Sequence, residues 1–104
     1  MAVGTVTIWS VHPGRAADFL KNAGAAKGIH ERLGGKVRLR QIVYGGPNSG
    51  QFVYTIEHTD MTAFAAFSDK LNANAEWLAH VAATGANTTA ALVSHSLTRD
   101  VPGF

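Results

Sequence analysis

Residues 36–58, KVRLRQIVYGGPNSGQFVYTIEH, decide the fold because they predict two strands joined by a short turn. The segments 36–44 and 51–58 are rich in β-branched and aromatic residues, and the GGPNSG segment at 45–50 is typical of a turn. Placing Val43 opposite Phe52 fixes the register. The other expected partners are Gln41 with Tyr54, Leu39 with Ile56, and Val37 with His58.

This register gives the hairpin two different faces. One face is mainly apolar and is expected to lie under helices; it carries Val37, Leu39, Phe52 and Ile56, together with Tyr54 and His58. The opposite face brings Arg38 opposite Glu57 as a cross-strand ion pair. We expect that second face to be open and to carry Trp9, Ile42, Tyr44 and Val53 as well.

The rest of the chain predicts one strand and one helix on each side of the hairpin. A strand over 3–11 ends at His12-Pro13-Gly14, and apolar residues at helical spacing predict a helix over 15–33. A second helix is expected over 61–83 and a last strand over 90–98. Gly24 and Gly28 lie inside the first helix, where they would either allow close approach to the sheet or mark a loosened functional turn, and we expect close approach. The order is β-α-β-β-α-β, an α+β domain spanning 1–104 with an antiparallel sheet and two helices on one face.

Two helices can cover only one face of such a sheet. In a chain of 104 residues, a second copy is the expected cover for the other face. We therefore predict a homodimer through the open sheet face, whose contact residues would be Ile42, Tyr44, Val53, Arg38 and Glu57.

Composition excludes several classes of function. The formal charge of +2 and the scattered basic residues argue against nucleic-acid binding, and no stretch is apolar enough to span a membrane. The chain has no cysteine and its N-terminal residues do not resemble a signal peptide, so a cytoplasmic location is expected. The five histidines fall in no metal-ligand spacing and the glycines form no phosphate loop, so we expect neither a metal nor a nucleotide.

A few aromatic and histidine side chains are candidates for a ligand site. Trp77 and His80 lie one turn apart on the second helix, where an indole could wall a planar ligand and an imidazole could exchange a proton. Tyr54 and His58 would be exposed by any gap between sheet and helices, and Trp9 could line the same cavity. His80 and His58 are the catalytic candidates. Each of these residues could instead pack in a core or at a subunit interface.

Taken together, the element order, the segment Val11-His12-Pro13-Gly14-Arg15 before a helix, and the late helix with Trp77 resemble the dimeric alpha-beta barrel superfamily. That superfamily includes antibiotic-biosynthesis-type monooxygenases, haem-degrading proteins, muconolactone isomerases, NIPSNAP-type proteins and stress-responsive barrels. The resemblance implies a ferredoxin-like fold, a homodimeric barrel and a pocket between helices and sheet in each subunit. Trp77 and His80 resemble residues of the haem-degrading members, but the strand from Thr5 to Val11 lacks their asparagine, which argues against haem.

Two functions therefore remain open. In the first, the protein is a small-molecule pocket protein, a cofactor-independent monooxygenase or an isomerase acting on an aromatic ligand. The resemblance to the monooxygenases implies a substrate that itself reduces oxygen, so no cofactor is expected. In the second, the protein is a non-catalytic ligand-binding or assembly module. A cavity of roughly 300 Å³ or more with convergent polar groups would favour the first.

Overall fold

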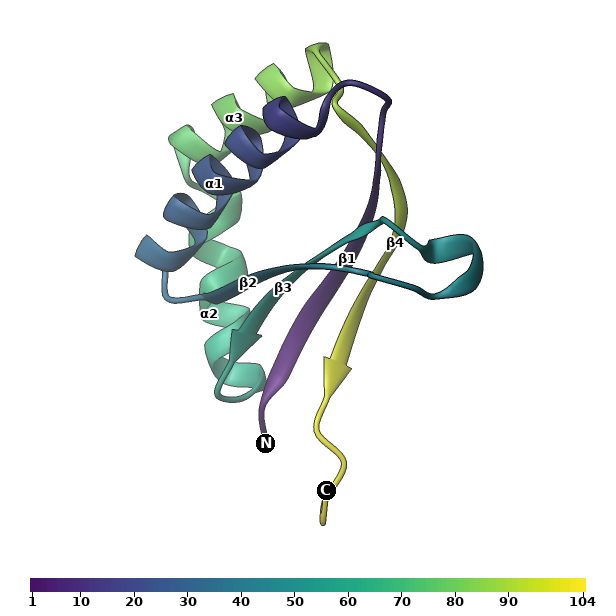
Figure 1. Cartoon of the computed structure of the whole chain (residues 1–104). Helices are drawn as coiled ribbons and strands as arrows, with labels where there is room; N and C mark the ends of the chain where they lie inside the picture. Colours follow the sequence, from purple (N-terminus) through teal and green to yellow (C-terminus); the bar gives the residue numbers. More distant parts are fainter.

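The computed structural model describes residues 1–104 as a four-stranded antiparallel sheet with its helices on one side (Figure 1). The strands are β1 (Val3–Val11), β2 (Lys36–Gln41), β3 (Phe52–His58) and β4 (Ala90–Arg99), in the order β2-β3-β1-β4. The helices are α1 (Ala16–Arg32), α2 (Met61–Asn72) and α3 (Ala75–Ala86). The predicted α+β, ferredoxin-like architecture is confirmed. No helix is long and apolar enough to cross a membrane.

The expected continuous helix over 61–83 is wrong, because the chain breaks it into α2 and α3. Asp60 begins α2, and its side chain accepts a hydrogen bond from the Ala63 amide at 2.8 Å. Asn74 begins α3 in the same way, accepting from the Trp77 amide at 2.8 Å. Asn is a strong N-cap residue that competes with the backbone inside a helix, so it starts a new helix at this point.

The hairpin register differs from the expected one by two residues. Leu39 lies opposite Tyr54 and Arg38 opposite Thr55, while Lys36 lies opposite Glu57, so the predicted Arg38–Glu57 pairing is wrong. Gly50, with a φ of +84°, turns the chain so that its amide donates to the Ile42 carbonyl at 2.7 Å. Because side chains alternate with a period of two, this shift leaves the residues of β2 and β3 on their expected faces.

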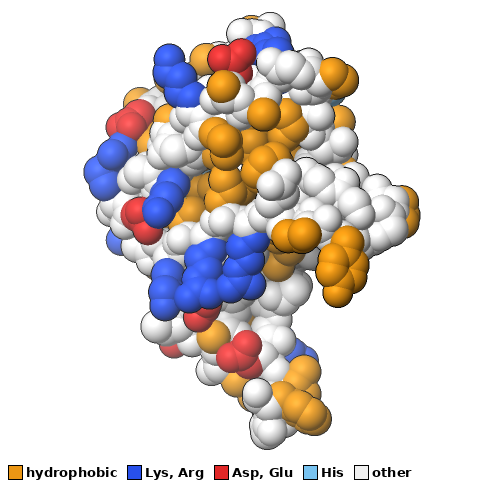
Figure 2. Space-filling model, in the orientation of Figure 1, with side chains coloured by type: hydrophobic (Ala, Val, Ile, Leu, Met, Phe, Trp, Pro, Cys, Tyr) orange, Lys and Arg blue, Asp and Glu red, His pale blue; other side chains and the backbone are white.

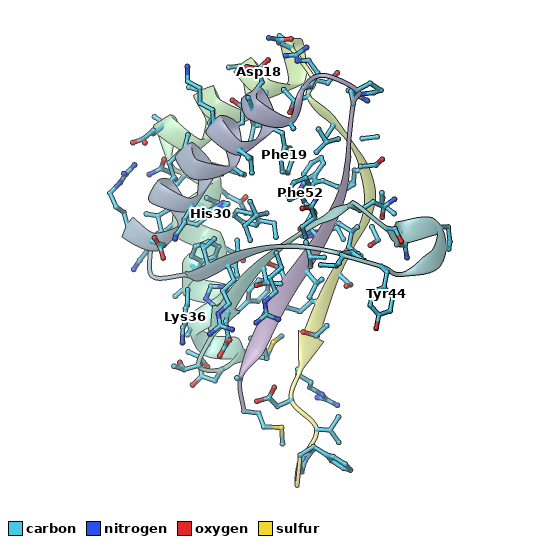
Figure 3. The ribbon with its side chains drawn as sticks, in the orientation of Figure 1. Asp18, Phe19, His30, Lys36, Tyr44 and Phe52 are labelled. Atoms are coloured by element: carbon cyan, nitrogen blue, oxygen red, sulfur yellow. The ribbon has the colours of Figure 1, made fainter.

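Because β2 ends earlier than expected, the tip of the hairpin lies outside the sheet. β2 ends at Gln41, and Val43 and Tyr44 lie in the connecting loop with side chains 87% and 89% exposed. Tyr44 points away from the sheet in Figure 3. The expectation that Tyr44 belongs to the open sheet face is therefore wrong, and Ile42 lies just beyond the end of the strand. Val53, Arg38 and Glu57 do lie in strands on the open face.

Trp9 lies on the helix-covered face, so its predicted place on the open face is wrong. It pairs with Phe52 across β1 and β3, and its ring centroid lies 6.4 Å from that of Phe19 on α1. Apolar residues occur on both faces of β1, which makes the pattern alone ambiguous. Val3 pairs with the buried His58, so Val3 and every second residue after it, up to Trp9, face the helices. Val6 and Ile8 face the open side instead.

The buried core is small for the length of the chain. Only 12 of 104 residues are buried, and no large side chain is completely enclosed. The helices cover one face of the sheet, and the other face is open (Figure 1). The central cluster is made of Ala26, Val37, Tyr54, Ile56 and Phe67. Figure 2 shows Lys and Arg side chains gathered along β2, where Lys36, Arg38 and Arg40 are exposed.

The close approach expected at Gly24 and Gly28 occurs at another glycine. A Cβ added at Gly24 would meet nothing within 4 Å, and one at Gly28 would meet only the end of the Arg32 side chain. At Gly35, between α1 and β2, an added Cβ would lie 2.6 Å from Ile56 Cγ2. The interpretation of Gly24 and Gly28 as close-packing positions is therefore wrong.

Candidate functional site

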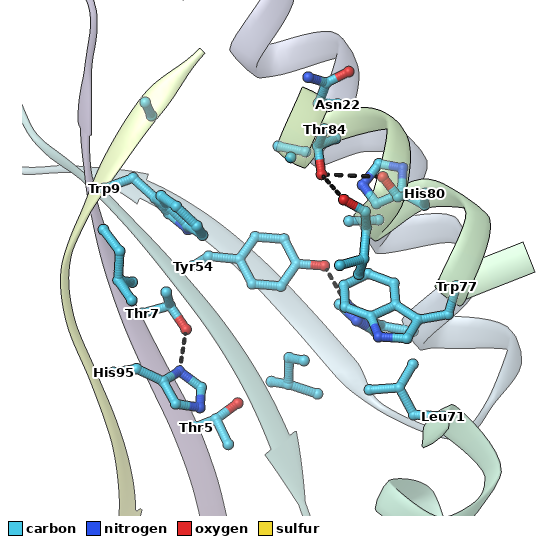
Figure 4. A pocket seen from close by; sticks show the side chains of 18 of the residues that line it. Thr5, Thr7, Trp9, Asn22, Tyr54, Leu71, Trp77, His80, Thr84 and His95 are labelled. Atoms are coloured by element: carbon cyan, nitrogen blue, oxygen red, sulfur yellow. Dashed lines mark hydrogen bonds between the residues drawn. The ribbon is translucent and has the colours of Figure 1, made fainter. Parts of the chain in front are cut away.

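A cavity of about 620 Å³ lies between the helix-facing side of the sheet and the three helices (Figure 4). All the helices and the strands β1, β3 and β4 contribute to its wall. Most of the wall is apolar or aromatic, and hydroxyl and imidazole groups converge on it from both sides. No Asp, Glu, Lys or Arg lines the cavity. Such a site suits an uncharged ligand, because a ligand charge would have no fixed partner there.

Tyr54 and His30 form a buried hydrogen-bonded pair in the wall. The Tyr54 hydroxyl lies 2.7 Å from His30 Nδ1, and both residues are buried. Burial, with a smaller effect from the nearby His80, lowers the pKa of His30 from 6.5 to about 4. Burial also raises the pKa of Tyr54 well above its usual range, with a smaller effect from Glu31. Both groups are therefore neutral near pH 7, and the pair presents a dipole rather than a charge.

The Trp77 ring lies close to two imidazoles. Its ring centroid is 4.5 Å from that of His30 and 5.5 Å from that of His80, and the planes of Trp77 and His80 differ by only 25°. The cap at Asn74 fixes the first turn of α3, which carries Trp77. The structure thus brings the predicted pair Trp77 and His80 together on the cavity wall, next to Tyr54.

A second hydroxyl and imidazole pair lies on the strands. Thr7 on β1 and His95 on β4 are direct cross-strand partners, and Thr7 Oγ1 lies 2.7 Å from His95 Nδ1. Thr7 is also the partner of Tyr54 on β3, so Tyr54, Thr7 and His95 form one row across three strands. Figure 4 shows this row facing the helices.

Of the five predicted site residues, only His58 lies outside the cavity wall; Trp9, Tyr54, Trp77 and His80 line it. The imidazole of His58 packs against Phe67 and Phe64, with ring centroids 4.7 Å and 5.5 Å away. Its Nε2 atom is buried without a hydrogen-bond partner, and burial lowers its pKa. His58 therefore occupies the core beside the site.

Sequence reasoning missed His30, Thr7 and His95. His30 lies one turn after Ala26 on the buried stripe of α1, so its position on that stripe was an available signal. Thr7 and His95 lie 88 residues apart, and their pairing depends on the register of β1 and β4, for which the sequence offers no local signal. No group of three His, Cys, Asp or Glu side chains could hold a metal ion.

The fold and site together define a ferredoxin-like α+β domain with a cavity between its sheet and its helices. Solved structures with a similar fold include NIPSNAP-like and antibiotic-biosynthesis monooxygenase-like proteins. No protein-family model matches the sequence, and no curated protein matches it.

Two of these structures illustrate the range of the similarity. A NIPSNAP domain protein from Burkholderia xenovorans is 18% identical, with a TM-score of 0.73, over 100% of this chain and 98% of the other. A variant of SnoaB, a cofactor-independent oxygenase from Streptomyces nogalater, is 21% identical, with a TM-score of 0.67, over 95% of this chain and 92% of the other. Similarity at these identities shows a shared fold.

Proposed function

We propose that this protein binds a neutral, oxygen-bearing aromatic molecule in its cavity and acts on it as a cofactor-independent oxygenase. The observation that carries the proposal is the wall of the cavity, where the indoles of Trp9 and Trp77 meet hydroxyl and imidazole groups without any fixed charge. The cavity volume of about 620 Å³ lies within the usual range for small-molecule sites and exceeds the roughly 300 Å³ expected of a ligand pocket.

The proposed chemistry requires the protein only to orient the ligand and to accept one proton. An anthrone provides a concrete example: its ring CH₂ loses a proton, and the resulting carbanion reduces O₂. The CH₂ group becomes a carbonyl, and one molecule of O₂ yields one oxygen atom to the product and one to water. The protein would orient the ligand with Trp77 and Tyr54, and remove the proton with a histidine of the wall. Similarity to the fold of SnoaB supports this reaction class.

A non-catalytic ligand-binding or assembly role is the second candidate. The observation in its favour is that the Tyr54 hydroxyl and His30 Nδ1 satisfy each other, as in a core network that holds α1 to the sheet. In that case the cavity would bind a ligand without turnover.

Dithranol, a dihydroxyanthrone, separates the two candidates. Oxygen uptake and appearance of the anthraquinone would be followed after mixing an anaerobic dithranol stock with protein in aerated buffer, against buffer and heat-denatured protein. The oxygenase proposal expects uptake of one O₂ per anthrone at least tenfold faster than in buffer, and a large loss of rate in Trp77→Ala. Tight binding without faster uptake would support the second candidate, and an isomerised product without oxygen uptake would indicate an isomerase. Absence of both binding and turnover would refute the pocket proposal.

We further propose that a second copy of the chain covers the open sheet face. That face carries Val6, Ile8 and Val53, while Arg38 and Glu57 add opposite charges that a two-fold related copy could pair. Only 12 residues are buried in one subunit, so covering this face would add apolar burial that the single chain lacks. Sedimentation at micromolar concentration tests this, and a monomer of 11.0 kDa would refute it.

A further inference from the structure

We propose that His95, held by Thr7, is the base that takes a proton from a hydroxyl or acidic CH group of the ligand. This inference rests on the proposed ligand-binding function of the cavity. Its starting observation is the 2.7 Å hydrogen bond between Thr7 Oγ1 and His95 Nδ1 on the strand side of the cavity wall.

The hydrogen bond leaves the second ring nitrogen available. His95 Nε2 makes no hydrogen bond within the protein, and His95 is exposed on β4, the strand at one edge of the sheet. When His95 Nδ1–H donates to Thr7 Oγ1, the lone pair of the neutral imidazole lies on Nε2. That tautomer can accept a proton from a ligand in the cavity.

A bulge in β4 shapes the wall beside His95. Ser94 pairs with Ile8, but the next β1 residue, Trp9, pairs with Leu92, so Val93 has no partner. In a regular strand Leu92 and His95, three residues apart, would face opposite sides. The bulge lets both line the cavity. Bulges that re-aim side chains in this way are frequent beside active sites.

The other titratable groups of the cavity suit this role less well. They are His30, Tyr54 and His80, and no carboxylate or cationic side chain lines the wall. His30 is buried and hydrogen-bonded to Tyr54, and the face of the His80 imidazole packs on Trp77. His95 alone combines a hydrogen bond that orients its ring through Nδ1 with a second nitrogen free of protein partners and access to solvent, to which the proton can later pass.

The proton transfer is balanced without any redox partner. The ligand O–H or C–H bond breaks, its electron pair stays on the ligand, and the proton forms an N–H bond at His95 Nε2. The products are an imidazolium and a ligand anion, which attract each other in a cavity with no competing charge. Thr7 does not touch the reacting atom and acts as a positioning residue.

Alizarin, a dihydroxyanthraquinone, tests the assignment because its visible absorbance distinguishes phenol from phenolate. Its apparent pKa would be measured free and bound to wild type, His95→Gln, Thr7→Val and the control His12→Gln, an exposed residue outside the cavity. We expect wild type and His12→Gln to lower the apparent pKa of the bound phenol by about one unit, a tenfold change. His95→Gln should lose the shift while retaining binding within about threefold, and Thr7→Val should lose part of it.

Nitrogen-15 NMR of the His95 ring provides a second measurement that needs no ligand. Wild type should show the Nδ1–H tautomer, and Thr7→Val should move His95 toward the Nε2–H form. An unchanged titration of bound alizarin in His95→Gln, loss of the shift in His80→Gln instead, or an Nε2–H tautomer in wild type would overturn the assignment while leaving ligand binding intact. Wild-type protein that binds no alizarin would instead overturn the proposed function.

Discussion

The Tyr54 hydroxyl and His30 Nδ1, 2.7 Å apart, connect the central strand β3 to α1 and form part of the cavity wall at the same time. Tyr54→Phe removes one partner and leaves a buried imidazole nitrogen unsatisfied. We expect a loss of about 1 to 3 kcal/mol in the free energy of unfolding, measured by urea denaturation. The double variant Tyr54→Phe with His30→Leu removes both partners and should recover part of that loss. A double variant less stable than the sum of both single changes would contradict this interpretation.

Stability should fall as the pH drops from 6.5 toward 4. The unfolded His30 titrates at its ordinary pKa of 6.5, whereas burial lowers the folded pKa to about 4, so within this window the unfolded state binds more protons. The loss from His30 is expected to reach up to about 3 kcal/mol, and His58, whose pKa burial also lowers, acts in the same direction. Urea denaturation at several pH values measures the slope. The double variant described above should reduce that slope and the exposed His12→Gln should not.

Gly24→Ala should stabilise the protein, because an added Cβ meets nothing within 4 Å and alanine favours the helix. The expected gain is about 0.5 to 1 kcal/mol, measured as the midpoint of thermal or urea unfolding. Gly35→Ala is the matched control. Its Cβ would lie 2.6 Å from Ile56 Cγ2, so a loss of about 1 to 3 kcal/mol is expected. Equal effects of the two substitutions would contradict the packing described at Gly35.

The caps of the two late helices offer a matched pair of substitutions. Asn74→Ala and Asp60→Ala each remove one side-chain acceptor at 2.8 Å from a backbone amide, and each should cost about 1 kcal/mol of stability. Only Asn74 fixes the turn that carries Trp77, so only Asn74→Ala should also weaken alizarin binding, by several fold. Quenching of tryptophan fluorescence measures the affinity. Equal affinity of the two variants would show that the cap does not position Trp77.

Val53→Glu should weaken the proposed dimer, since it places a charge on the open face near Val6 and Ile8. The expected result is a shift toward monomer in sedimentation at micromolar concentration. Leu20→Glu on α1, a side chain already 46% exposed, is the control and should leave the oligomeric state unchanged. A monomeric wild type, or a Val53→Glu variant that stays dimeric, would rule out this interface.

Apart from the break at Asn74 between α2 and α3, the sequence was sufficient for the order of elements, because alternation and helical spacing report local geometry. It was insufficient wherever two arrangements shared the same pattern. A hairpin shifted by two residues keeps Val37 and Ile56 on the same face, so only the turn at Gly50 could reveal the correct register. Trp9 was assigned to the wrong face for a similar reason, because β1 is apolar on both sides.

The site was predictable where its residues are local and was missed where they meet through pairing. Trp77 and His80 lie one turn apart on a single helix, and the structure places both on the cavity wall. Thr7 and His95 meet only because β1 lies between β3 and β4, and His30 reaches Tyr54 only through the packing of α1 on the sheet. His58 shares the helix-facing side of β3 with Tyr54, but the rings of Phe64 and Phe67 enclose it.

The uncharged cavity wall also determines how the protein would respond to salt. Dissolved ions screen charges outside the cavity, such as the Lys36, Arg38 and Arg40 group on β2, over a distance of about 10 Å at 0.1 M ionic strength. The cavity wall contains no fixed charge that dissolved ions could screen. Affinity for a neutral ligand would therefore stay nearly constant as ionic strength rises, whereas any contact made through the β2 cations would weaken.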